Sequence, residues 1–283
     1  MAVTAVSDVS GTIETVVSTI LTQTLIQESK ALGAAAIRDF SSMVRPGMDQ
    51  LDVPLMSELA VQTVSETVAV TAQTMTSSEA NLILNRHRSV PFALGDRVAI
   101  QSKVALVREA VMNGAKSLSA EIDNYIFGLI DAAASTAAPD HRLALTANPL
   151  QDLTNAKFLL DSQNVSMMGR TVFASPGFIK LLLDDSTIVN ANQYGGADAQ
   201  RNGFVTRLFG FDIIESSSSS IVDAGFQACG SSVIAFARQI MPKFERERNV
   251  LAHRDEYSMS HLYGAVATED SGVRIVVYDA DGA

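Results

Sequence analysis

The chain has 283 residues, 47% of them hydrophobic, which is enough for a packed core in one large domain or two medium ones. Its 31 acidic against 21 basic side chains give a net charge of −10, which excludes a nucleic-acid binder driven by long-range attraction to phosphates. No signal peptide, bilayer-spanning apolar run or cysteine pair is present, since Cys229 is alone. We therefore expect a soluble, unsecreted protein that does not contact a membrane.

The first third of the chain contains one helical pattern followed by strand patterns. Apolar spacing over residues 12–40 predicts a helix, which ends at Arg45-Pro46-Gly47. The Val- and Thr-rich stretch 61–75 predicts a β-hairpin or a long two-stranded loop. Residues 81–96 read NLILNRHRSVPFALGD, so alternating apolar residues flank a basic triplet directly before a long helical pattern.

That pattern predicts a single helix of about 40 residues and about 60 Å over 96–136. Asp96 is a suitable N-cap. Such a length is typical of a spine across a flat or extended molecule, because a compact domain cannot bury it. The apolar or small residues follow steps of three and four: Val104, Val107, Val111, Ala115, Leu118, Ile122, Ile126, Leu129 and Ala133.

After residue 139 the pattern changes to short elements, which predicts a second, mixed α/β lobe. Asn148-Pro149 is expected to cap a helix to about residue 161, and Ser175-Pro176 a helix to residue 183 after a strand at 170–174. Residues 203–215 predict two strands meeting at Phe209-Gly210.

The last part predicts a helix over 233–241 and a final hairpin. Its strands are 261–267 and 273–278, joined by a turn at 269–272. The fold class is therefore α+β.

This order of elements resembles the major capsid proteins of tailed phages, which have the Hong Kong 97 capsid fold. The similarity lies in 81–96, in 169–185 (GRTVFASPGFIKLLLDD) and in 208–216 (LFGFDIIES) with the closing hairpin. The resemblance implies an N-terminal arm at 1–54 and an extended loop at 55–95. It also implies a peripheral domain with the spine helix at 96–148 and 251–283, and an axial domain at 149–250.

The resemblance implies a non-enzymatic, self-assembling subunit of an icosahedral virion shell, assembled in the host cytoplasm around double-stranded DNA. Its partners would be copies of itself in pentamers and hexamers, with scaffolding, portal and decoration proteins, and DNA without sequence-specific contact. Some relatives cross-link a loop lysine to a neighbour, but this chain has no lysine between Lys30 and Lys103. We do not expect that chemistry here.

The basic triplet Arg86, His87 and Arg88 would lie at the base of the projecting loop. With Phe92, it is a candidate subunit interface, where charge-assisted hydrogen bonds to an acidic neighbour would set register. The alternative is a solvated strand face.

No catalytic, cofactor or metal site is predicted. The four histidines lack zinc-site spacing, the Asp279 to Gly282 stretch lacks the rest of a calcium loop, and no nucleotide-binding motif occurs. Cys229 is expected to be a buried structural thiol. The methionines, including Met167-Met168, are expected to lie in cores or interfaces. The segment Glu245–Arg248 is expected to be either a solvated helix end or an inter-subunit ion-pair cluster.

Three alternatives remain open from the sequence. An encapsulin-like compartment would keep the fold and enclose a cargo enzyme, with a groove formed by the N-terminal helix. A soluble α/β enzyme would bind a small molecule around 190–203, and a ring-forming tail-tube protein would not need so long a helix.

Overall fold

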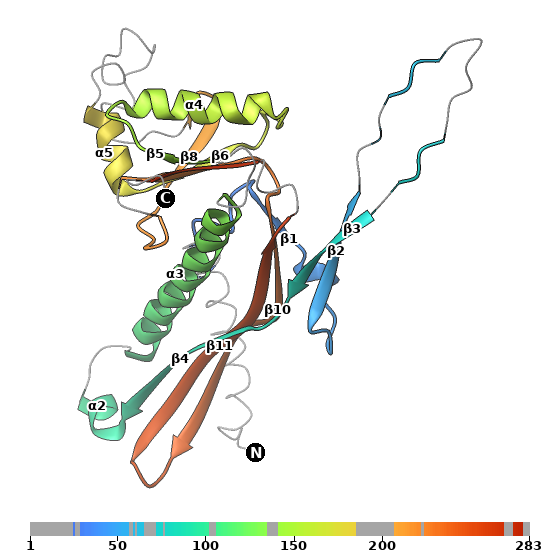
Figure 1. Cartoon of the computed structure of the whole chain (residues 1–283). Coiled ribbons are helices and arrows are strands. Elements are labelled where there is room, and N and C mark those ends of the chain that lie inside the picture. The colour runs from blue at the N-terminus through green and yellow to red at the C-terminus, as the bar shows by residue number, and fades with distance from the viewer. Residues whose placement is uncertain are drawn as a thin grey trace, which may run out of the picture.

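The computed structural model describes residues 25, 29–56, 59, 61–64, 72–75, 77–101, 106–134, 141–184, 207–221, 224–268 and 274–279. One long helix lies along the first β-sheet and meets the second β-sheet near its C-terminal end, and a two-stranded hairpin projects to the side (Figure 1). This mixed α+β arrangement agrees with the predicted fold class.

The first sheet has four strands in the order β1-β10-β11-β4. A long antiparallel hairpin forms its centre, and β4 pairs antiparallel with β11 along its whole length. The short β1 pairs in parallel with the start of β10. The strands are β1 (Ile37–Asp39), β4 (Arg86–Gly95), β10 (Ile234–Asn249) and β11 (Arg254–Ala267).

The second sheet has six strands in the order β5-β12-β9-β6-β8-β7. Two helices, α4 (Pro149–Ser162) and α5 (Pro176–Asp184), cover one face, and α3 covers the other (Figure 1). The strands are β5 (Arg142–Ala144), β6 (Thr171–Ala174), β7 (Arg207–Leu208), β8 (Phe211–Glu215), β9 (Phe226–Cys229) and β12 (Ile275–Asp279).

The predicted single helix over 96–136 is two helices. α2 (Asp96–Gln101) is set off from the end of α3 (Leu106–Ala134), and residues 102–105 are outside the described part (Figure 1). The 29 residues of α3 make it about 43 Å long, and residues 135–136 of the predicted helix also lie outside the described part. Unbroken helical spacing in the sequence does not reveal a change of axis, because both segments keep the same period.

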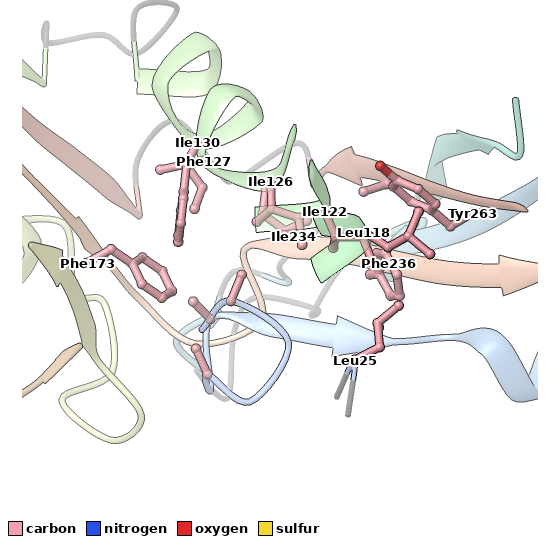
Figure 2. Close-up of a cluster of buried hydrophobic side chains, with 14 of the residues drawn as sticks. Leu25, Leu118, Ile122, Ile126, Phe127, Ile130, Phe173, Ile234, Phe236 and Tyr263 are labelled. Atoms are coloured by element: carbon pink, nitrogen blue, oxygen red, sulfur yellow. The ribbon is translucent and has the colours of Figure 1, made fainter. Parts of the chain in front are cut away.

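The largest core joins α3 to both sheets. Ile122 and Ile126 lie beside Ile234 of the first sheet, and Phe127 packs on Phe173 of the second with ring centroids 4.8 Å apart (Figure 2). All five side chains are fully buried. Because one helix contributes to both packing surfaces, it fixes the two sheets relative to each other.

The hairpin has its own small core on the opposite face of the first sheet. Its strands are β2 (Gln50–Met56) and β3 (Ser77–Ile83), and the short helix η1 (Ser41–Met43) precedes them. Leu82 and Leu84 pack against Ala235 and Ala237, whereas the alternate β10 residue Phe236 points into the α3 core. The base of the hairpin is thus fixed to its own subunit.

Several predicted elements are confirmed. Asn148 Oδ1 accepts a hydrogen bond from the Gln151 N–H (3.3 Å) and caps α4, and Ser175 Oγ accepts one from the Phe178 N–H (3.2 Å) and caps α5. The two strands predicted to meet at Phe209-Gly210 are β7 and β8.

Three predictions are wrong. Residues 234–241 are strand, not helix, because this segment pairs on both sides with β1 and β11. The last two strands do not form a hairpin, since β11 and β12 belong to different sheets. Residues 29–40 are turns and β1, whereas the rest of the predicted 12–40 helix, apart from the helical residue Leu25, is outside the described residues.

Candidate functional site

The basic triplet lies where the chain passes from the hairpin into the first sheet. β3 ends at Ile83 and β4 begins at Arg86, so the predicted continuous strand 81–96 is two strands in two different sheets. Because side chains alternate along a strand, Arg86 and Arg88 face α3, whereas His87 is exposed on the opposite face. The structure therefore divides the predicted triplet between two faces.

Glu121 on α3 is the acceptor that receives Arg88. The Arg88 Nε–H donates to Glu121 Oε1 (2.7 Å), and the Tyr263 hydroxyl donates to Glu121 Oε2. The hydrogen bond and the charge of Glu121 raise the pKa of Arg88. Burial, followed by the interaction with Glu121, raises the pKa of Tyr263 well above its usual range. We call Arg86, Arg88, Glu121, Tyr125 and Tyr263 the hairpin-base clamp.

Arg86 completes this clamp one helical turn further along. Its guanidinium carbon lies 4.0 Å from the ring centroid of Tyr125, a cation–π contact. The Tyr125 hydroxyl donates to the Ala265 carbonyl oxygen (3.2 Å) and its ring meets Tyr263 edge to face, with centroids 5.9 Å apart. Glu121 and Tyr125 are four residues apart and so share one helix face. The clamp joins β4, α3 and β11.

His261 lies beside the clamp and is 1% exposed. Its ring centroid is 4.7 Å from that of Tyr263, and neither ring nitrogen has a hydrogen-bond partner among the described residues. Burial lowers the pKa of His261 to about 4, since the effect of Glu121, which raises it, is smaller, and Arg238, His87 and Arg88 lower it further. The histidine is therefore neutral at physiological pH.

Phe92 lies further along β4 and does not join the triplet. Its ring stacks on Tyr257 with centroids 4.8 Å apart. Both residues line a groove of about 860 Å³ over β4, β11 and β10, with Pro91 and Ala93. Three carboxylates also line the groove: Glu245, Glu247 and Glu256.

The Glu245–Arg248 run is on strand β10, so the predicted helix end is wrong. Arg246 pairs with Asp255 (2.8 Å), and Arg248 donates from Nη2 to Asp96 Oδ2 (2.6 Å). The hydrogen bond from Arg248 lowers the pKa of Asp96. Both arginines of the Glu245–Arg248 run thus have partners within the chain. The pair between Arg248 and Asp96 ties the β10–β11 hairpin to the start of α2.

The remaining candidates for chemistry have structural surroundings. Cys229 is buried as predicted, and burial raises the pKa of its thiol far above the usual range. Asp279 is buried at the end of β12 and accepts a hydrogen bond from Arg142 (2.8 Å), which gives its carboxylate a structural partner. The predicted ligand loop 190–203 lies outside the described residues, and within the described part no cluster of His, Cys, Asp and Glu could hold a metal ion.

The residues that the sequence did not single out are Glu121, Tyr125 and Tyr263. The i, i+4 spacing of Glu121 and Tyr125 was visible, but Tyr263 lies more than 130 residues away. Only the register of β4 against β11, which places Arg86 opposite Tyr263, brings them together.

Residues 92–276, more than half of the chain, match the family described as phage capsid protein. Among solved structures, one from Mycobacterium phage Che8 has 21% identity and a TM-score of 0.67 over 83% of this chain and 86% of that one. The capsid of cyanophage P-SCSP1u has 14% identity and a TM-score of 0.69 over 88% of this chain and 87% of that one. The mature capsid of bacteriophage PhiM1 has 12% identity and a TM-score of 0.66 over 87% of this chain and 85% of that one.

No curated protein is significantly similar in sequence. Within the described residues, no helix has both the length and the apolar character needed to cross a membrane.

These likenesses to solved structures show that the chain has the fold of phage capsid proteins. The chain belongs to the phage capsid protein family, as the resemblance implied. It is a structural component of the virion that assembles with copies of itself, so the enzyme alternative is wrong.

Proposed function

We propose that copies of this chain close into the icosahedral shell of a tailed phage, assembled in the host cytoplasm around double-stranded DNA. The projecting hairpin carries this proposal, because among its described residues those packed in the hydrophobic core of their own subunit lie at its base. Beyond the base, Leu59, Val61 and Val64 are 55%, 99% and 78% exposed. An isolated two-stranded hairpin is marginally stable in water, so contact with a neighbour would stabilise it.

We also propose that Arg86, His87, Arg88 and Phe92 contribute to a subunit interface. Arg88 keeps 44% of its side chain exposed after pairing with Glu121, and His87 is exposed on the other face. Phe92 lines the groove over β4 and β11. The clamp would then set the angle of the hairpin while the exposed parts of these residues meet the neighbour.

The lobe division is part of the same proposal. The four-stranded sheet and α3 would form the peripheral lobe and the six-stranded sheet the axial lobe. The predicted boundaries would change accordingly, because β10 lies in the first sheet and β12 in the second. Scaffolding, portal and decoration proteins would be further partners, and DNA would be enclosed without sequence-specific contact.

The test is assembly of the purified chain, followed by light scattering and negative-stain electron microscopy. We expect closed shells or capsomers, with DNA inside particles from infected cells. A protein cargo instead of DNA would support the compartment alternative, and a monomer unchanged at high concentration would contradict any shell.

The interface is tested by matched variants. Arg86→Gln with Arg88→Gln should reduce shell yield and leave the subunit folded, whereas Glu121→Gln weakens only the hydrogen bonds of Arg88 and Tyr263 inside the subunit. Equal yields from these two variants would show that the arginines act through the clamp alone, and a wild-type yield from the double variant would end the interface proposal.

A further inference from the structure

We infer that the turn at residues 163–170 inserts two methionines into an apolar notch on the six-stranded lobe of a second copy. We call it the methionine turn. The inference rests on the proposed shell, because it needs neighbouring copies of the same chain. It concerns the six-stranded lobe and not the projecting hairpin.

The methionine turn is held rigid by Arg170, whose side chain is 2% exposed. Its guanidinium donates from Nε to the Ser166 carbonyl oxygen (2.9 Å) and from Nη2 to the Val165 carbonyl oxygen (2.5 Å). Nη1 pairs with Asp161 (2.7 Å) at the end of α4. Burial of an arginine is unfavourable unless its donors are satisfied, and here two of them bind carbonyl oxygens of the turn while a third ties the turn to α4.

The backbone of the turn is constrained further by Gly169, which has φ +75°. A Cβ at this position would lie only 3.3 Å from the Cβ atoms of Ala35 and Ser231. The Met168 N–H also donates to Ser166 Oγ (3.2 Å). These contacts leave the turn little freedom.

This rigid turn displays Met167 and Met168, which are 58% and 82% exposed. The predicted core position for these two methionines is therefore wrong, and the interface position remains. Methionine adapts its shape to apolar pockets, and a fixed backbone reduces the entropy lost on binding. Paired exposed apolar side chains on a constrained turn are typical of a protein contact.

The matching surface is a notch of about 350 Å³ between β5 and α4. Leu143, Leu159 and Tyr278 contribute to its apolar lining, and Phe158 at its edge is 69% exposed. The lining is mainly apolar but also includes Thr146 and Asn155, and the volume of the notch is sufficient for a methionine side chain. Within the described chain, Met168 does not fill it, since that side chain is largely open to solvent.

A second copy is the occupant that these surfaces favour. The donor turn and the receiving notch are different surfaces of one lobe, so a contact between them is head to tail. Repeated head-to-tail contacts produce closed rings when the rotation closes. A capsid protein assembles with its own copies, and each copy brings both halves of this contact.

The test is site-directed cross-linking in assembled particles. Phe158→Cys together with Met168→Cys, treated with a short thiol-to-thiol cross-linker, should give a ladder of covalent oligomers on a denaturing gel. Each single variant should stay monomeric, because Cys229 is buried and does not react. Met43→Cys with Phe158→Cys is a matched control, since Met43 is also 58% exposed but lies on η1.

The outcomes separate this inference from the proposed function. Particles that form without a ladder would overturn the inference and leave the shell intact, and dimers from Met168→Cys alone would overturn it in favour of a symmetric methionine contact. Wild-type protein that forms no particles would instead contradict the proposed shell. As a second measurement, Met168→Asp should block ring formation and Met168→Asp with Phe158→Lys should restore it, whereas unchanged assembly of Met168→Asp would overturn the inference.

Discussion

Replacement of Gly264 by alanine should loosen the hairpin base from the first sheet. A Cβ at Gly264 would lie 2.2 Å from the Ile83 carbonyl oxygen and 2.9 Å from the Ile83 carbonyl carbon. Both are backbone atoms at the end of β3, so no side-chain rotation can relieve the overlap. The end of β3 would have to retreat by about 1 Å to reach an ordinary van der Waals distance.

The expected cost follows from this geometry. Overpacking in a well-packed region lowers the free energy of unfolding by about 1–3 kcal/mol. Gly264 does not have a positive φ, so the alanine backbone itself is unstrained and the loss comes from the displaced strand. Since Leu82 and Leu84 belong to the small core next to Gly264, that core should open first.

Urea denaturation measures the stability, and amide hydrogen exchange at residues 80–84 measures the opening of the hairpin base. Gly95→Ala is a matched control, because a Cβ at Gly95 would meet no atom within 4 Å. A Gly264→Ala variant as stable as the Gly95→Ala variant, with unchanged exchange at Leu82 and Leu84, would refute the reasoning.

Three further predictions concern the clamp, the buried histidine and the core. Glu121→Gln should lower the free energy of unfolding by about 1–2 kcal/mol, because it weakens two hydrogen bonds. A double-mutant cycle with Arg88→Gln should give a non-zero coupling energy, and a coupling energy of zero would contradict the prediction. The pKa of His261 is about 4 in the folded protein against 6.5 in the unfolded chain. Its contribution to the free energy of unfolding is therefore fully present above pH 6.5 and is lost as the pH falls toward 4, by about 3 kcal/mol in total. Denaturation midpoints at pH 7 and 5 should therefore differ more in the wild type than in His261→Gln, and equal differences would argue against this role. Phe127→Ala should lower the free energy of unfolding, measured by calorimetry, by about 3–5 kcal/mol. A loss below about 1 kcal/mol would show that α3 does not hold the second sheet through this ring.

Elements with a local signal were predictable from the sequence. The caps Asn148 and Ser175 depend on no distant part of the chain, since each side chain accepts a hydrogen bond from the N–H three residues further on. The helical period of α3 likewise needs only neighbours along the chain. The burial of Cys229 followed from the ordinary behaviour of a lone thiol in an apolar segment.

The segment 234–249 shows where local signals fail. Its short apolar run is compatible with helix or strand, and pairing with β1 and β11 decides for strand. Residues 37–39 and 234–236 are nearly 200 positions apart, so nothing local to either could reveal that they are adjacent.

The basic triplet combines both kinds of information. The sequence by itself determined that charge interrupts an alternating apolar stretch, and from the order of elements that the chain resembles a capsid subunit. Tertiary structure decided that Arg86 and Arg88 point at α3 while His87 points away, because the register of β4 against β11 sets which side chains share a face. A shift by one residue would exchange those faces, and only long-range pairing fixes it.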